Sequence, residues 1–468
     1  MRLILSLAAV STALITPSPS LAGDNITMAE IQERLKTLSQ KVNRLSGIVE
    51  QQNAVIRKQE KALEAQAKAL EKARLDHMQA VEPAAGDADR NSAGHISDSS
   101  LKMESADGSV SVQAFGRVHM DATFFDDDAS DNADSTNLRR ARLGLEGRLG
   151  DDFEYESEFD FAGNDIDIKD VNLTYTALSV ADITIGHFRS LGMERQTSSN
   201  NTSFVERSGP TNTFAPDRQI GAAIKTKKEN WSLGVGLFGE EAGNDDTGDD
   251  EDHFINARAT ANLLGLMQED TQHVLHIGAG FSFRNTTGDI RYRTRPGTGD
   301  GARLIDTGNI SSVDSVDIVN AELGGVFGPA HFLGEYFSSS LSRDGGFADA
   351  EFDGYYGQIG YFLTGENRSY SGKSGVFKDT SPARPFNLGT GGPGAWEVVF
   401  RYENTDLNDS GAGILGGEMD TYTGGLNWYA SDNIRFLANV IAVDTDENTA
   451  TAPDDDPIVY NLRAQWDF

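Results

Sequence analysis

The sequence contains no cysteine, which excludes disulfide bonds and thiol chemistry. Basic residues are scarce: 40 lysines and arginines stand against 72 aspartates and glutamates, for a formal net charge of -32. A chain with this excess of acid is a poor partner for nucleic acid. Proline is also sparse, with 12 residues against 49 glycines in a chain of 468. That balance suits strands joined by turns.

Long hydrophobic runs are missing beyond the N-terminal segment. The mean hydropathy is -0.41, and no later stretch has the roughly 18 consecutive apolar residues that a membrane-spanning helix needs. A transmembrane β-barrel is compatible with these averages, because only every second residue of its strands faces lipid.

The first 22 residues have the features of a secretory signal peptide. Arg2 provides the positive charge, residues 3–15 form an apolar core, and Ser20, Leu21 and Ala22 form a cleavage site of the usual type. The pattern predicts that residues 1–22 are removed and that the mature chain begins outside the cytoplasm.

A heptad pattern over residues 26–78 predicts an N-terminal α-helical coiled coil, which we assign to residues 23–80 in the periplasm. Several d positions are glutamine, which leaves the number of helices open and is compatible with a trimer; a single solvated helix is the alternative. Residues 81–109 are rich in Asp, Ala, Gly and Ser and predict a flexible linker. The a positions are all apolar: Met28, Leu35, Val42, Val49, Ile56, Leu63 and Leu70.

From residue 110 onward, apolar and polar residues alternate. In residues 458–468, one face carries Ile458, Tyr460, Leu462, Ala464, Trp466 and Phe468. A strand of about ten residues with this pattern spans a membrane with one face in lipid and the other toward water. An edge strand of a soluble sandwich alternates in the same way, so the rest of the chain must decide between the two.

The alternation recurs in sixteen segments, and single-chain bacterial barrels have an even number of strands. We therefore predict an all-β transmembrane barrel of about sixteen antiparallel strands over residues 110–468. Short turns fall on the predicted periplasmic side and most long connections outside, with 364–394 as the exception. The expected strands are 110–125, 137–149, 152–163, 167–178, 181–189, 218–228, 230–240, 253–264, 272–284, 313–327, 330–342, 350–363, 395–405, 418–430, 433–445 and 457–468.

One predicted strand carries four carboxylates on a single face: Glu154, Glu156, Glu158 and Asp160. Such a row is costly in a soluble core but suits a water-filled lumen. The preceding strand has arginines at matching depth, so we expect arginine–carboxylate pairs across the wall.

Several motifs of this region resemble the phosphate-selective porin O and P family. They are LRRARLGLEG at residues 138–147, TSFVERS at 202–208, APDR at 215–218, YFLTGE at 361–366 and GAWEVVFRY at 394–402. The resemblance implies a sixteen-stranded, trimeric barrel in the bacterial outer membrane that passes phosphate or polyphosphate. In some members a periplasmic coiled coil precedes the barrel.

The resemblance also implies that inward-folded loops narrow the channel and that their basic residues bind the anion. The corresponding loops are 190–217 and 285–312. In the second, arginines at alternate positions would share one face, and their planar guanidinium groups match phosphate oxygens; an external loop that contacts lipopolysaccharide phosphates is the alternative. The candidate constriction residues are Arg284, Arg291, Arg293, Arg295 and Arg303. The candidate lumen-wall residues are Arg117, Arg140, Arg142, Arg148, Arg258, Arg401, Arg435 and Arg463.

Acidic runs on the predicted external loops depart from this pattern. They lie at residues 126–128, 245–252 and 454–456, and they would repel anions within a Debye length of about 10 Å at 0.1 M salt. They could instead be neutralised by divalent cations that bridge lipopolysaccharide, or be ordinary solvated loops. The ion preference of the pore therefore stays open at this point.

We find no nucleophile–base constellation and no metal-ligand spacing, so we predict no enzyme, no cofactor and no metal site. The predicted function is an outer-membrane porin for small inorganic anions, as a homotrimer in contact with lipopolysaccharide and outer-membrane lipid. One alternative is a general or cation-preferring porin on the same barrel. Another is a structural protein that tethers the outer membrane to peptidoglycan through the coiled coil.

Overall fold

A computed structural model of the chain describes Lys36 and residues 95–97, 100–163, 165–190, 192–226, 228–239, 252–267, 272–286, 288–446 and 454–468. The predicted signal peptide, the coiled coil apart from Lys36, and most of the acidic run 245–252 lie outside the described residues. The chain divides into two units, residues 1–89 and 90–468. All the strands among the described residues belong to the second unit.

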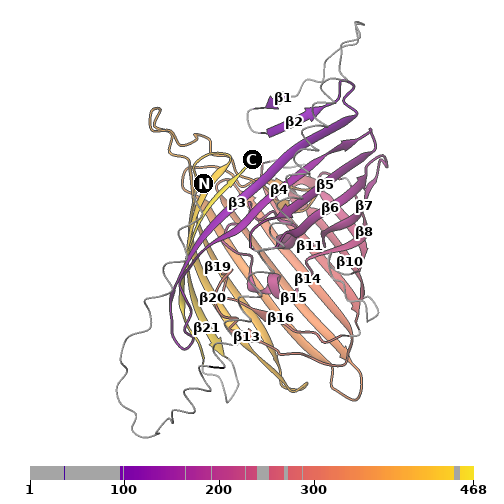
Figure 1. Ribbon diagram of the computed structural model, residues 1–468, viewed down its shortest axis with the longest axis vertical. Coiled ribbons are helices and arrows are strands. Elements are labelled where there is room, and N and C mark those ends of the chain that lie inside the picture. The colour runs from indigo at the N-terminus through magenta and orange to yellow at the C-terminus, as the bar shows by residue number, and fades with distance from the viewer. Residues whose placement is uncertain are drawn as a thin grey trace. The chain divides into compact units, whose positions relative to one another are not determined.

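Sixteen strands of the second unit form a closed antiparallel barrel, each paired with the next along the chain (Figure 1). They are β3 (Val110–Asp126), β4 (Ser135–Leu149), β5 (Phe153–Asp160), β6 (Asp167–Tyr175), β7 (Ala181–Arg189), β8 (Arg218–Thr226), β9 (Trp231–Phe238), β10 (His253–Asn262), β11 (Val274–Asn285), β14 (Val313–Phe327), β15 (Ala330–Arg343), β16 (Ala350–Phe362), β19 (Ala395–Asp409), β20 (Ile414–Tyr429), β21 (Ile434–Asp446) and β22 (Ile458–Asp467). Each predicted strand overlaps one of these, so the predicted barrel is confirmed.

The last strand closes the ring by pairing with the first. In β22 and β3, Ile458 is opposite Asp126 and Asp467 is opposite Arg117. In Figure 1 the indigo of β3 accordingly lies beside the yellow of the C-terminal strands. Closure leaves no unpaired strand edge in the ring, as a sheet that crosses lipid requires.

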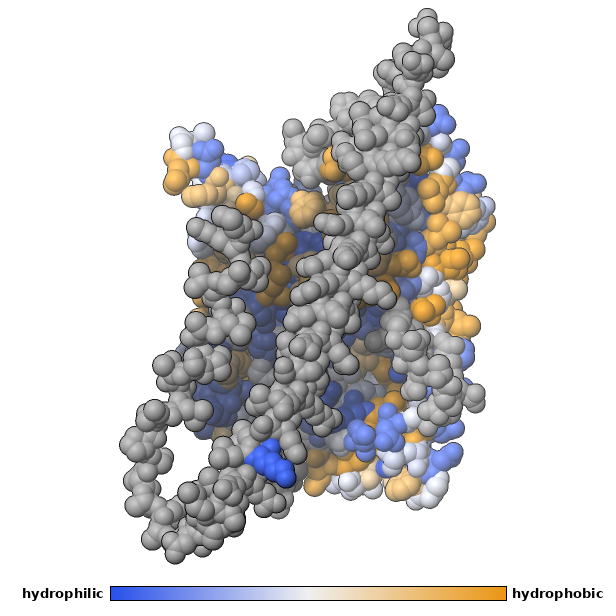
Figure 2. Space-filling model, in the orientation of Figure 1, coloured by the Kyte–Doolittle hydropathy of each residue, from blue (hydrophilic) through white to orange (hydrophobic). Residues whose placement is uncertain are grey.

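Side chains alternate between the two faces of the wall. In β4, Leu143 and Leu145 are 47% and 45% exposed, whereas Arg140 and Arg142 on the other face of the strand are buried. Apolar residues gather on the uncovered flank of the barrel in Figure 2. The exposed face is thus apolar and the inner face polar, which is the pattern of a barrel in lipid. In the described part of the chain, no helix is long and apolar enough to cross a membrane.

The connections differ between the two ends of the barrel. Tight turns lie at the end where β3 begins, as at Gly328 and Pro329 between β14 and β15, where Gly328 adopts a φ of 60°. A hairpin of β1 (His95–Ser97) and β2 (Ser100–Glu104) adds to β3 at the same end, with Leu101 opposite Ala114. These two strands lie within the segment 81–109 that we expected to be a linker.

The remaining elements are short and belong to connections. They are α2 (Met193–Gln196), α3 (Gly209–Phe214), α4 (Leu263–Met267), β12 (Arg293–Thr294), β13 (Ile305–Asp306), β17 (Tyr370–Ser371) and β18 (Val376–Phe377). All of them except α4 and β17 have buried side chains. Three connections therefore fold inward and shape the lumen.

The two faces of β4 should respond differently to charge. We expect Leu143→Arg to destabilise the barrel by about 2–4 kcal/mol, because an arginine on the lipid face near mid-membrane loses its hydration. Urea unfolding in lipid vesicles measures this change. Glu146→Arg, on the lumen face of the same strand, is the control. An equal loss of stability for both variants would contradict the assignment of the faces.

Candidate ion pathway

The loop 190–217 crosses the lumen. It leaves the wall between β7 and β8, the fifth and sixth strands of the ring. Its backbone is held by strands of the opposite wall: Gly209 N donates to Glu403 Oε2 in β19 (3.2 Å), and Val205 N donates to Asn439 Oδ1 in β21 (2.9 Å). Because the fifth strand of sixteen lies across from the thirteenth, the loop spans the channel from wall to wall.

The loop 285–312 also lies against the inner wall. Tyr292 packs on Phe214 of α3 and Phe352 of β16, with ring centroids 5.3 and 5.7 Å apart, and its hydroxyl bonds Ser339 Oγ at 2.8 Å. Farther along the loop, Asp300 Oδ2 accepts hydrogen bonds of 2.7 Å from the side chains of Ser135 and Asn137. The loop thus runs from β11 to the region of β4.

The segment 364–394 enters the lumen from the other end of the barrel. Arg368 Nη1 donates to Ser203 Oγ of loop 190–217 at 2.6 Å. The carbonyls of Ser374 and Gly375 accept hydrogen bonds of 2.8 and 2.7 Å from Arg258 of β10. This interior position explains why a long connection lies on the side of the short turns.

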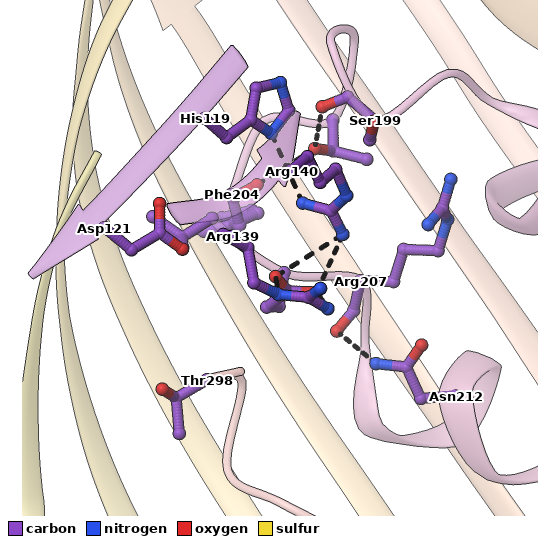
Figure 3. Close-up of polar contacts among 12 residues, drawn as sticks. His119, Asp121, Arg139, Arg140, Ser199, Phe204, Arg207, Asn212 and Thr298 are labelled. Atoms are coloured by element: carbon purple, nitrogen blue, oxygen red, sulfur yellow. Dashed lines mark hydrogen bonds and ion pairs between the residues drawn. The ribbon is translucent and has the colours of Figure 1, made fainter. Parts of the chain in front are cut away.

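A β-bulge turns two successive arginines of β4 into the lumen. The register between β3 and β4 shifts so that His119 is opposite Arg140 but Met120 is opposite Leu138, which leaves Arg139 without a partner residue. A bulge of this kind interrupts the alternation of faces. Figure 3 shows Arg139 and Arg140 together beside the loop that carries Phe204 and Arg207.

Both arginines bind the carboxylate of Glu206. Arg139 Nε lies 2.8 Å from Oε1, and Arg140 Nη2 lies 3.3 Å from Oε2. Arg463 of β22 lies 3.2 Å from Oε1. Burial raises the pKa of the Glu206 carboxyl, but the three guanidinium groups outweigh burial and hold this pKa well below its usual range. Glu206 is therefore ionised at neutral pH.

A cavity of about 580 Å³ lies on the lumen side of β3 to β7, between loop 190–217 and segment 364–394. Its lining carries both signs of charge. The basic lining residues are Arg117, Arg189 and Lys378, and the acidic ones are Glu146, Glu156, Asp170, Asp379 and Asp467. The space is open and polar, which suits the passage of hydrated ions rather than the burial of an apolar ligand.

Comparisons with known proteins agree with this architecture. A family model described as "Phosphate-selective porin O and P" matches residues 112–468. The chain belongs to this family. The family and the fold are those of porins and not of enzymes, which confirms that the chain is no enzyme. It is a bacterial outer-membrane porin whose strands form a β-barrel.

Two relatives and one solved structure illustrate the similarity. Porin O of Pseudomonas aeruginosa is 26% identical over 413 residues, 79% of this chain and 91% of that protein. A protein of Caulobacter vibrioides described as "Uncharacterized protein" is 33% identical over 319 residues; the match covers 64% of this chain and less than two thirds, 61%, of that relative. The OmpTdeltaL8 structure from Vibrio cholerae has a TM-score of 0.50 at 12% identity and covers 77% of this chain and 100% of its own.

The expected ion pairs across the porin wall are present. Arg117 and Arg142 lie 2.8 and 3.1 Å from the carboxylate of Glu158, and Arg142 lies 2.8 Å from Asp160. Arg218, at the start of β8, lies 3.6 Å from Glu158. Glu158 and Asp160, the two carboxylates of the row that lie farther from the end where β3 begins, are therefore neutralised by buried arginines.

The other predicted wall arginines also have partners. Arg258 binds Glu322 at 2.7 Å, Arg463 binds Asp121 at 2.7 Å, and Arg435 donates to the Thr202 carbonyl at 2.8 Å. Arg401 binds Glu403 and lies over the Phe204 ring at 4.4 Å. Arg148 differs, since it is exposed at the end where β3 begins and lies 3.0 Å from Glu104. All the predicted wall arginines except Arg148 are buried, so little free positive charge remains on the wall.

The predicted loop arginines are more accessible. Arg291 and Arg293 are exposed and alternate with the buried Tyr292 and Thr294, so they share one face as expected. Arg303 is exposed too. Its pKa is lowered by the partial desolvation of its guanidinium group and by the positive charges of the nearby Arg295 and Arg293. Arg291 Nε lies 2.7 Å from Asp306 Oδ1 and Arg295 Nε donates to the Gly301 carbonyl at 2.8 Å, while Arg284 lies over the Phe254 ring at 5.2 Å.

Several lumen cations were not among the predicted site residues: Arg139, Arg189, Arg195, Arg207, Arg218 and Arg368. Arg207 and Arg218 stand in the motifs TSFVERS and APDR, so the resemblance contained a signal for them. Arg139 stands in LRRARLGLEG, but strict alternation assigns it to lipid, and only the bulge places it inside. Among the described residues, no group of three or more His, Cys, Asp or Glu could hold a metal ion.

Removing one carboxylate should show how the wall is stabilised. We expect Glu158→Gln to destabilise the porin by about 3–5 kcal/mol, because the buried Arg117 loses its counter-charge and the buried Arg142 keeps only Asp160. Unfolding by guanidinium chloride, followed by tryptophan fluorescence, measures the change. Glu154→Gln, at an exposed position of the same strand, should change stability by less than about 0.5 kcal/mol. Similar effects of the two substitutions would refute the ion-pair network.

Proposed function

We propose that this porin passes small inorganic anions, phosphate or polyphosphate above all, by passive diffusion past an arginine-lined constriction. The observation that carries the proposal is the set of exposed arginines on the inward loop 285–312. Tyr292 packs against the wall, and Arg291 and Arg293 on either side of it are exposed, so we infer that these two arginines face the water of the channel. The family description, with its reference to phosphate, points in the same direction.

The chemistry of these residues supports anions over cations. A guanidinium group stays protonated and offers a planar fork of donors that matches phosphate oxygens. Arg291 is ion-paired with Asp306, and the loop 285–312 carries four arginines against three aspartates. Clustered cations that repel each other gain energy when a solute anion enters, and such rings of charge set the selectivity of channels.

A general or cation-preferring pore is the second candidate. Within the described residues, no ion pair joins Glu146, Glu154 or Glu156 to a cation, and these carboxylates lie on the lumen face nearer the end where β3 begins. They would attract cations there. The acidic external runs at 126–128 and 454–456 add to the same tendency.

For the assembly, we propose a homotrimer embedded in lipopolysaccharide and outer-membrane lipid. An apolar hollow of about 700 Å³ on the outer wall supports a protein neighbour there, because small and large side chains alternate around it. Contact with peptidoglycan would require the predicted coiled coil, which lies outside the described residues. The hollow is lined in part by Met120, Ala122, Leu138, Trp396, Leu426, Trp428, Phe436, Ala438, Leu462 and Ala464.

The loop arginines can be tested by removing them together. Replacing Arg291, Arg293 and Arg295 by alanine should shift the reversal potential in a potassium chloride gradient toward cation preference and weaken block of the current by phosphate. The reason is that three of the four clustered cations are lost. Planar-bilayer recordings measure both quantities. Arg148→Ala, at the opposite end of the barrel, is the control, and an unchanged reversal potential in the triple variant would remove these residues from the filter.

The unpaired carboxylates decide between the two candidates. If the pore prefers anions, replacing Glu146, Glu154 and Glu156 by glutamine should raise that preference moderately, because three negative charges leave the pathway. If the unmodified pore already carries mainly cations, and the substitution abolishes that preference, the second candidate is correct. The same salt-gradient recordings provide the measurement, at low ionic strength where screening is weak.

A further inference from the structure

The carboxylate of Glu206 occupies the place where three arginines converge. Arg139 and Arg140 approach it from β4 at 2.8 and 3.3 Å, and Arg463 approaches from β22 at 3.2 Å. The side chain of Glu206 is 7% exposed, whereas that of Arg139 is 34% exposed. The cluster is therefore buried on the Glu206 side and reachable from the channel on the Arg139 side.

The loop that carries Glu206 is positioned by its backbone. Arg401 Nη1 donates to the Glu206 carbonyl at 3.1 Å, and the neighbouring Val205 N donates to Asn439 Oδ1 at 2.9 Å. These contacts hold the loop against β19 and β21 without help from the Glu206 carboxylate. The carboxylate is thus available for an electrostatic role.

The charges of the cluster do not cancel. Three guanidinium groups, from Arg139, Arg140 and Arg463, face two carboxylates, Glu206 and Asp121, of which Asp121 is held by Arg463 at 2.7 Å. One positive charge is in excess, and without Glu206 the excess would be two. In addition, the buried Arg140 Nε has no hydrogen-bond partner, so the cluster has a donor left over.

A carboxylate and a phosphate compete for the same donors, because both present oxygens with negative charge to the guanidinium fork. A solute anion at this point of the channel meets arginines that already bind an anion of the protein. It must share or displace Glu206 to bind them, and the carboxylate returns when the solute leaves. Conduction needs binding that is strong enough for entry yet weak enough for release.

We propose that Glu206 is an internal counter-anion that competes with solute anions for Arg139 and Arg140 and so sets how tightly the pore holds phosphate. The inference rests on the proposed anion pathway and assigns a specificity-determining role within it. The proposal gives different roles to two groups of cations in the lumen. The accessible loop arginines attract anions, whereas the Glu206 cluster limits how long the anions remain bound.

The test is Glu206→Gln in the full-length porin, reconstituted in planar bilayers. Chloride current is recorded while inorganic phosphate is added. The phosphate concentration that halves the current should fall by about tenfold or more, since charge-assisted hydrogen bonds of this strength are released for the solute. An unchanged half-blocking concentration would overturn the proposal, and so would an increase.

Glu322→Gln is the matched control. Glu322 is a buried carboxylate bound by Arg258 at 2.7 Å and by His276 at 3.0 Å, and its side chain is 0% exposed. Its loss removes one charge at a place that solutes do not reach. The half-blocking concentration should change by less than about twofold in this variant; an effect as large as that of Glu206→Gln would mean that net charge, not competition, is measured.

Binding and structure can be separated in solution. Phosphate that binds only the folded porin raises its melting temperature, and Glu206→Gln should enlarge this rise. If Glu206 only fixes the loop, the variant melts earlier and gains nothing from phosphate, which overturns the proposal. If glutamine prevents folding, Glu206→Asp keeps the charge but shortens the side chain, and block should again occur at lower phosphate than in the unmodified porin. Failure of the anion pathway itself is distinct, since the unmodified porin would then show no anion preference at all.

Discussion

The backbone of a chain that crosses lipid must satisfy its own hydrogen bonds, and the closed ladder between β22 and β3 does so here. Once the ladder is closed, the only remaining requirement of the lipid environment is that the outward-facing side chains are apolar. Every alternate position is then free to be polar. This is why Leu143 and Arg142 are neighbours in one strand, although one faces hydrocarbon and the other lies in an ion-pair network.

The inner face is a polar core and not an empty tube. Loop 190–217 and segment 364–394 lie against the wall arginines inside the lumen, so these arginines become buried and need counter-charges. Single carboxylates accordingly hold several cations: Glu158 is within 3.6 Å of Arg117, Arg142 and Arg218. A consequence is that wall charge mostly stabilises the fold. Accessible positive charge lies on the loop 285–312, where Arg291, Arg293 and Arg303 are exposed.

The strands and their faces could be predicted because both depend on local period. Alternation over about ten residues identified all sixteen strands. Matching depth on neighbouring strands predicted that arginines of β4 pair with carboxylates of β5, as Arg142 does with Glu158 and Asp160. The bulge at Arg139 could not be predicted in this way. Its cause is the register of β4 on β3 near Met120, which is a relation between two strands. Its trace in the sequence is slight: the exposed Leu138 and Leu143 are an odd number of positions apart.

The inward path of segment 364–394 was equally beyond local pattern, although the segment contains a physical hint. Val376 and Phe377 are 4% and 2% exposed, and apolar residues of this size are out of place in a solvated turn. With lipid excluded by the polar residues around them, the lumen is the environment that can bury them. The hydrogen bond from Arg368 to Ser203 then joins this segment to loop 190–217. Connections from both ends of the barrel therefore meet inside the lumen, which the number of strands alone does not determine.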